Sequence, residues 1–154
     1  MIEIVREARV DAPVEQVWSA VSDPDRLAGW FAFAERIEVR SGEGVGQLRT
    51  QHGRWGSRRA EVDQEITAVE PNRLLAWRHV AERLNGKPAP KFAASTEFRI
   101  ELESHGEATT VRLRSRQEPA GPVKGWVMKA FGTKEVARNL DTSLASLSEA
   151  LLLK

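Results

Sequence analysis

The chain has 154 residues, of which 41% are apolar and 29% charged, so it is long enough for one domain with one hydrophobic core. Lysine and arginine total 23 against 22 aspartate and glutamate, and the basic residues are spread along the chain, which argues against a nucleic-acid partner. There is no cysteine, so disulfides, thiolate metal sites and cysteine nucleophiles are excluded.

The start of the chain and its apolar runs bear on where the protein acts. Residues 1–4 already alternate and lack the basic-then-apolar order of a secretion signal. No apolar run approaches the roughly 20 residues of a membrane span. We therefore expect a cytoplasmic protein without stable membrane insertion.

The spacing of apolar residues predicts first a strand and then a helix. Residues 2–10 alternate loosely between apolar and charged side chains, which is typical of a strand with one solvent-exposed face. Pro13 then suits a first helical position, where its missing N–H costs no hydrogen bond. Apolar residues follow at three- and four-residue intervals and predict a short amphipathic helix; they are Val14, Val17, Trp18 and Val21. Trp18 is assigned to the packed face of this helix.

A second short helix is expected directly after the first. Pro24 begins it, Ser22 or Asp23 caps it, and Gly29 lies near its end. Its core-facing side chains are Leu27 and Trp30.

From residue 35 to residue 116 the apolar period changes to two, which predicts antiparallel strands joined by tight turns. Each strand has one apolar and one charged face; Val62 and Ile66, for example, alternate with Glu61, Asp63 and Glu65. The predicted strands are 36–41, 46–53, 58–69, 73–81, 92–103 and 108–116.

A long helix with one buried face is predicted from Pro122 to the end of the chain. Its apolar stripe consists of Ala137, Leu140, Leu144, Leu147 and Leu151. Gly125 and Gly132 each cost about 1 kcal/mol relative to alanine in a helix, so we expect a bend or short break near Gly132 and Thr133.

The sequence predicts seven antiparallel strands with one apolar face and a single long helix with one apolar stripe. A curved sheet that wraps around the helix buries both apolar surfaces. We therefore predict an α+β helix-grip fold with two short helices between strands 1 and 2, forming one domain over residues 1–154.

Four segments in a fixed order carry a family resemblance. They are VDAPVEQVW at 10–18, SDPDRL at 22–27 followed by Trp30, EPNRL at 70–74 entering the strand of Trp77, and the closing Leu-rich helix. Together they resemble the START-like (SRPBCC) superfamily, also described as birch-pollen-allergen-like or as polyketide cyclase/dehydrase and lipid-transport proteins, over essentially the whole chain. The resemblance implies the helix-grip fold and an elongated hydrophobic cavity between the sheet and the long helix.

Small residues at expected inward positions point to the same cavity. They are Ala8, Ala60 and Ala94 on strands, and Ala130 and Ala137 on the helix. The alternative is that these alanines only permit close packing of helix on sheet.

The expected walls of the cavity are mainly aromatic. Five tryptophans without a tyrosine favour an apolar lining over one rich in phenolic hydroxyls. The candidate ligand-binding residues are Trp30, Phe33, Ala60, Gln64, Trp77, His79, Phe98, Leu113, Trp126 and Ala130, with Phe131 beside them. Core packing is the competing interpretation for each aromatic residue. Gln64 is either a structural hydrogen-bond node or a polar contact for a ligand.

Few residues suggest catalysis. His79 shares a strand face with Trp77 and is the candidate general acid or base if that face is inward, whereas His52 and His105 are expected to be exposed. Motifs for metals, nucleotides and a serine hydrolase are missing, so we expect no metal and no cofactor. Arg112, Arg114 and Arg116 are expected on the wet face, paired with acidic residues of neighbouring strands such as Glu97 and Glu101.

Two functions from different classes remain. The first is a monomer or homodimer that binds or carries a small hydrophobic molecule, such as a lipid, quinone, polyketide or other aromatic metabolite, by enclosure alone. The second is a polyketide aromatase/cyclase or dehydrase acting on a ligand in the same cavity. Gln64, Thr96 and His79 are the inward polar candidates, which is little for catalysis and favours binding. A stress-related or chaperone-cofactor interaction domain is a third interpretation.

Overall fold

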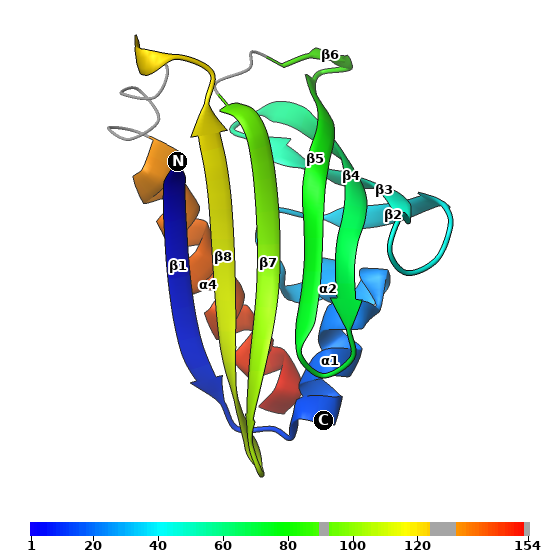
Figure 1. Cartoon of the computed structure of the whole chain (residues 1–154), viewed down its shortest axis with the longest axis vertical. Helices are drawn as coiled ribbons and strands as arrows, with labels where there is room; N and C mark the ends of the chain where they lie inside the picture. Colours follow the sequence, from blue (N-terminus) through cyan, green and yellow to red (C-terminus); the bar gives the residue numbers. More distant parts are fainter. Residues whose placement is uncertain (90–92, 124–131, 153–154) are drawn as a thin grey trace.

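A curved antiparallel sheet wraps around a long C-terminal helix in the computed structural model, which describes residues 1–89, 93–123 and 132–152 (Figure 1). In chain order the elements are β1 (Ile2–Val10), α1 (Val14–Ser22), α2 (Pro24–Trp30), β2 (Arg36–Ser41), β3 (Leu48–Trp55), β4 (Arg58–Glu70), β5 (Leu74–Leu84), β6 (Lys87–Pro88), β7 (Ala93–His105), β8 (Ala108–Pro119) and α4 (Thr133–Leu152). The predicted α+β helix-grip fold, with two short helices after the first strand, is confirmed.

The strands follow the order β1-β8-β7-β5-β4-β3-β2, and all neighbours pair antiparallel. The predicted strands do not include β6, a strand of two residues that pairs with the end of β5. Asn85 and Gly86 connect them with φ of 50° and 80°, the left-handed values that a two-residue hairpin turn needs. These residues were interpreted as part of a turn, which was correct, but β5 continues three residues beyond its predicted end, to Leu84.

The two short helices hold each other through one buried hydrogen bond. The Asp23 side chain caps α2 by accepting from the Asp25 N–H at 2.9 Å. At the end of α2 the indole N–H of Trp30 donates to the carbonyl of Ala20 in α1 at 2.9 Å. Trp30 is therefore a structural residue whose polar atom is already satisfied.

The predicted apolar stripe of α4 faces the sheet. Leu140, Leu144, Leu147 and Leu151 are buried, and Ala137 is half-buried. Ser143 interrupts the stripe but is also fully buried, because its hydroxyl donates to Asn139 O at 2.7 Å and accepts from Ala32 N–H at 2.8 Å. None of the described helices is long and apolar enough to cross a membrane.

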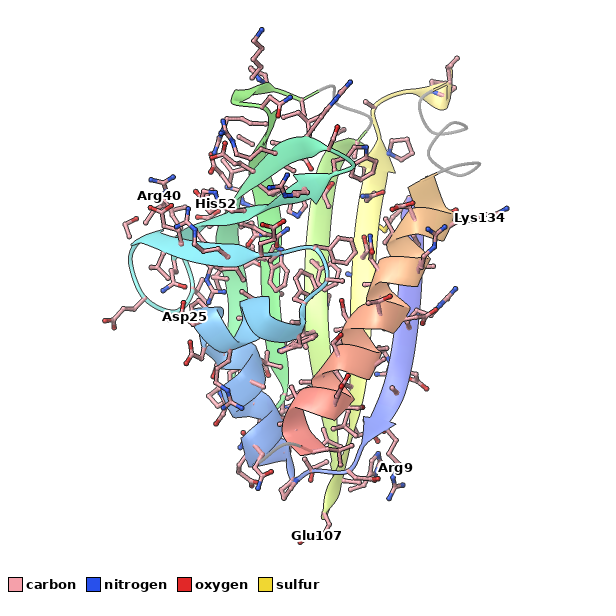
Figure 2. All side chains as sticks on the ribbon, turned by 180° about the vertical axis from the view of Figure 1, so that it is seen from behind. Arg9, Asp25, Arg40, His52, Glu107 and Lys134 are labelled. Carbon is pink, nitrogen blue, oxygen red and sulfur yellow. The ribbon has the colours of Figure 1, made fainter. Side chains whose placement is uncertain are left out.

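The covered face of β5, β7 and β8 changes character along its length. The part we call the packed half carries aliphatic side chains: Leu75, Ile100, Leu102, Val111 and Leu113. The part we call the cavity half carries aromatic and polar ones: Trp77, His79, Thr96, Phe98, Ser115 and Gln117. The change occurs at one level across the strands, because Ile100 pairs with Leu113 while Phe98 pairs with Ser115. α4 begins beside the cavity half, at the end where Lys134 lies, and runs away from it (Figure 2).

The other face of the sheet carries the predicted network of arginines and carboxylates. Arg114 donates to Glu101 at 3.1 Å and 3.2 Å and to Glu3 at 2.6 Å, while Arg112 donates to Glu7 at 2.9 Å. Burial alone would raise the pKa of Glu101, but hydrogen bonds from Arg114 and Arg99 outweigh it and hold that pKa below the usual value. These charges stabilise the outer surface of the sheet.

Candidate functional site

A cavity of about 70 Å³ lies between the cavity half of the sheet, the loop after α2 and the first turn of α4. Phe31, Phe33, Trp77, Phe98 and Val136 form its apolar walls. Gln51, His79, Thr96, Ser115 and Gln117 supply its polar groups. No carboxylate, lysine or arginine is among these described lining residues.

The aromatic walls pack on one another. Trp77 and Phe98 are cross-strand partners, and their rings stack with centroids 5.0 Å apart and an interplanar angle of 18°. Phe31 meets both edge-on, at 5.7 Å from Trp77 and 5.2 Å from Phe98, and Phe33 leans on Phe31 at 5.0 Å. Such contacts add roughly 0.5–1.5 kcal/mol per pair beyond burial. Because the rings contact one another, they leave little space between them. The cavity is much smaller than the roughly 300–1,000 Å³ of sites that hold drug-sized ligands.

Trp77 carries an unsatisfied donor. Its side chain is 2% exposed, and among the described residues its Nε1 is the only side-chain nitrogen or oxygen that is itself sealed from solvent and has no hydrogen-bond partner. A buried donor left alone costs about 1–3 kcal/mol, so native proteins give it a partner of their own, a water or a ligand.

Gln64 is a structural node. It is 2% exposed, and its Nε2 donates to Gln51 Oε1 at 2.9 Å. The Gln51 Nε2 in turn donates to the carbonyl of Phe33 at 3.2 Å. The loop approaches β3 closely here, because a Cβ on Gly53 would lie 2.6 Å from that carbonyl oxygen. Gln64 therefore fixes the loop that presents Phe33 to the cavity, although it does not line the cavity itself.

His79 lies at the cavity with a carboxylate beside it. Its Nδ1 is 3.2 Å from Glu82 Oε1. Residues three apart normally point to opposite sides of a strand, but His79 pairs with Gln64 and Ala81 with Asp63, so Val80 is an extra residue at a bulge. The bulge brings the imidazole and the carboxylate to one side of β5.

The other histidines lie away from the cavity. His52 Nε2 is 3.0 Å from Glu38 Oε1 on the outer side of β3, near Arg40 (Figure 2). Its side chain is 18% exposed, so the prediction that it is exposed was wrong: the carboxylates of Glu38 and Glu61 and the neighbouring strands enclose it. His105 is exposed, as predicted, and bonds to Thr110 at 3.0 Å.

The structure brings together four of the predicted ligand-binding residues: Phe33, Trp77, His79 and Phe98. Four others lie outside the lining, namely Trp30, Ala60, Gln64 and Leu113, of which Leu113 is fully buried in the packed half. Trp126 and Ala130, together with Phe131, lie outside the described residues.

None of the described alanines lines the cavity. Ala94 is exposed, which contradicts its expected inward position, because a register shift between Ala93 and Ser95 interrupts the alternation at the start of β7. Ala8 and Ala60 are half-buried and do not line the cavity. The short polar side chains of Thr96 and Ser115 line it instead.

Several lining residues were missed from the sequence. They are Phe31, Gln51, Ser115, Gln117 and Val136. Ser115 and Gln117 continue the alternation of Val111 and Leu113, so a polar residue at an otherwise apolar position was a usable signal. Phe31 carried no such signal, because it follows the end of α2 and its direction depends on the loop.

The described residues contain no group of three or more histidine, cysteine, aspartate or glutamate side chains that could hold a metal ion. The groups at the cavity are aromatic rings, the hydroxyls of Thr96 and Ser115, two carboxamides, and one imidazole with a carboxylate beside it.

Comparison with solved structures defines the fold class. TTHA0849 from Thermus thermophilus superposes with a TM-score of 0.77 at 19% identity, over 99% of this chain and 98% of that one. Ginseng major latex-like protein 151 from Panax ginseng gives 0.76 at 12% identity, over 97% and 96%. DynU16, a putative protein in the dynemicin biosynthetic locus, gives 0.66 at 22% identity, over 97% of this chain and 46% of that chain.

The class is thus the START-like, birch-pollen-allergen-like helix-grip fold. The family model for polyketide cyclase/dehydrase and lipid transport matches residues 1–151, and the chain belongs to that family. Among curated proteins, none matches the sequence.

Proposed function

We propose that the protein binds a small hydrophobic molecule in the cavity between the sheet and α4, by enclosure rather than by bond chemistry. The observation that carries the proposal is the closed aromatic cluster of Phe31, Phe33, Trp77 and Phe98 around a cavity with neutral polar groups. Apolar walls with a few oriented polar groups are the usual composition of small-molecule sites.

The small volume of the cavity narrows the classes of ligand that the family resemblance suggests. A cavity of about 70 Å³ is smaller than the roughly 150 Å³ that holds benzene in an engineered protein core. Any ligand must therefore displace a wall. Phe33 is the best candidate to move, since it is half-buried and lies on the loop between α2 and β2. We favour a compact aromatic metabolite over a lipid, a quinone with a long tail or an extended polyketide.

A fluorescence titration tests the proposal. Small aromatic and isoprenoid compounds should change the tryptophan emission, because Trp77 lines the cavity. Ser115→Leu should weaken binding at least tenfold by filling the space, whereas Ser115→Ala, the matched control, should bind like the native protein. No response across a broad set of compounds, or equal binding by both variants, would contradict the proposal.

A second function, ring closure or dehydration of a polyketide, is favoured by the pairing of His79 with Glu82 at the cavity. A carboxylate that orients an imidazole is a common arrangement for a general base. The fold neighbour DynU16 is described as a putative protein of a biosynthetic locus. His79→Ala separates the two functions: under the binding proposal ligand affinity stays within about twofold, whereas abolished turnover of a defined polyketide would support the enzyme.

The single domain is also proposed to act in the cytoplasm as a monomer or homodimer. The edge strand β2 bears exposed charges on Arg36 and Arg40, which disfavour growth of the sheet by edge pairing. Light scattering on the purified protein should give one or two copies of the chain; a larger assembly would contradict this.

A further inference from the structure

Two neutral polar side chains lie side by side in the cavity half. Thr96 on β7 and Gln117 on β8 are cross-strand partners, and both line the cavity. They lie two residues beyond the pair of Phe98 and Ser115, on the side away from the packed half. Cross-strand partners have Cβ atoms about 4.5–5.5 Å apart, so one polar group of a ligand can reach both side chains. We call Thr96 and Gln117 the polar pair.

The direction of these two side chains follows from the ion pairs of their neighbours. Arg116, which precedes Gln117, donates to Glu3 at 2.8 Å on the outer face of the sheet. Glu97, which follows Thr96, is 3.9 Å from Arg116 on the same face. Successive side chains of a strand point to opposite faces. The polar pair therefore points to the covered face, where the cavity lies.

The polar atoms of this pair are unpartnered and accessible. Neither the Thr96 hydroxyl nor the Gln117 carboxamide forms a hydrogen bond with another described residue. Among the described residues, only Trp77 Nε1 is both without a partner and sealed from solvent, so the atoms of the polar pair have accessible surface, although Thr96 is only 8% exposed as a whole. The carboxamide of Gln64 differs, because it donates to Gln51 at 2.9 Å. The polar pair is therefore open to a ligand.

The hydrogen-bonding capacity of the polar pair indicates which group it fits. A hydroxyl donates and accepts, and a carboxamide has an NH₂ group that donates and an oxygen that accepts. A ligand hydroxyl also donates and accepts, so it can bond to both side chains at once. A ketone oxygen, as in acetophenone, only accepts and leaves the carboxamide oxygen of Gln117 without a donor. A hydroxyl is also small, which suits a cavity of about 70 Å³.

We infer that the cavity selects a compact aromatic ligand with a hydroxyl group, such as a phenol, whose ring lies against Trp77 and Phe98 and whose hydroxyl bonds to the polar pair. The inference rests on the proposed function and adds the class and orientation of the ligand. The strand register supports the orientation, because Trp77 pairs with Phe98 at one level and Thr96 pairs with Gln117 at the next. A hydrocarbon of the same shape gains the same aromatic contacts but leaves the polar pair without a partner.

The test compares phenol with toluene, which carries a methyl group in place of the hydroxyl. Calorimetry or ligand-detected NMR gives both dissociation constants in the native protein, in Thr96→Val and in Gln117→Leu. Each variant should weaken phenol about fivefold and change toluene less than about twofold, the loss expected for one hydrogen bond between neutral groups. Thr110→Val is the matched control, because Thr110 bonds to His105 away from the cavity; it should leave both constants unchanged. An equal effect of the test variants on both compounds would overturn the inference while leaving the proposed function intact.

A second measurement uses the native protein alone and does not depend on the stability of the variants. In protein labelled with ¹⁵N, the side-chain amide resonances of Gln117 should move further with phenol than with toluene. The side-chain amide of Gln64 is the internal control and should stay in place, because it already donates to Gln51 and does not line the cavity.

The results distinguish failure of the inference from failure of the proposed function. If both compounds bind but neither the variants nor the Gln117 resonances distinguish them, the inference is wrong and the proposed function stands. If neither compound binds at its solubility limit, the proposed function fails for compact aromatic ligands, and the inference fails with it.

Discussion

The packed half and the cavity half of the sheet lie on the same three strands and under the same helix, yet they are built differently. In the packed half Ile100 faces Leu113 across β7 and β8, and aliphatic side chains fill the space beneath α4. Two residues further along, Phe98 faces Ser115, and the aromatic rings leave a cavity. Large rigid rings beside short hydroxyl side chains fill space less completely than interdigitated aliphatic chains. The close aliphatic packing therefore lies in one half and the proposed binding site in the other.

The largest expected effect is in the packed half. Leu113→Ala removes a fully buried side chain and should lower the free energy of unfolding by about 2–5 kcal/mol. Urea denaturation measures it, with Leu113→Met as the volume-conserving control that should lose less than about 1.5 kcal/mol. A loss below about 1 kcal/mol in Leu113→Ala would show that the packed half is looser than its burial indicates.

A smaller loss is expected at the boundary of the cavity. Gln64→Leu leaves Gln51 Oε1 without its donor and should cost about 1–3 kcal/mol. The double variant with Gln51→Leu should lose less than the sum of the single losses; strict additivity would mean that the two side chains act independently.

On the outer face of the sheet, the effect of a substitution should not depend on whether it lies behind the packed half or the cavity half, because ion pairs lie behind both. Glu101→Gln removes the partner of Arg114 and Arg99 and should cost about 1 kcal/mol at neutral pH. Since the folded pKa of Glu101 lies below its unfolded value, this stability is present above the unfolded pKa and is lost as the pH falls through the folded one.

The difference in unfolding free energy between Glu101→Gln and the native protein should thus narrow as the pH falls below the usual glutamate pKa of about 4.3. Unfolding free energies measured from about pH 7 to about pH 3 test this. Glu97→Gln is the control with small effect, since its ion pairs with Arg99 and Arg116 are 3.6 Å and 3.9 Å long and partly exposed. A gap that does not narrow as the pH falls below the usual glutamate pKa would contradict the assignment.

The smallest effect is expected inside the cavity half. Ser115→Ala removes a hydroxyl that no described residue hydrogen-bonds, so the unfolding free energy should change by less than about 0.5 kcal/mol. The same substitution at the buried and doubly bonded Ser143 should cost more, about 1–2 kcal/mol. Equal losses at the two serines would show that Ser115 has a partner.

The order of elements and most of the packed half were accessible from the sequence, because apolar residues at periods of two and 3.6 determine which faces become buried. Trp77, Phe98 and His79 were placed correctly for the same reason. Phe31 and Phe33 were harder: only Phe33 was named, and the position of both depends on a loop held by Gln51 and Gly53. The expectation for Ala94 was wrong because the size of a side chain does not reveal a register shift. The bulge that joins His79 to Glu82 is likewise a property of strand pairing, which a single sequence does not encode locally.

The most direct test of the central claim is a map of backbone amide shifts during a titration with acetophenone. The shifts should gather at four residues of the cavity half: Trp77, Thr96, Phe98 and Ser115. Residues of the packed half, such as Ile100, Leu102 and Val111, should stay unchanged. Shifts centred on the packed half, or spread over the outer face of the sheet, would contradict a binding site at the cavity.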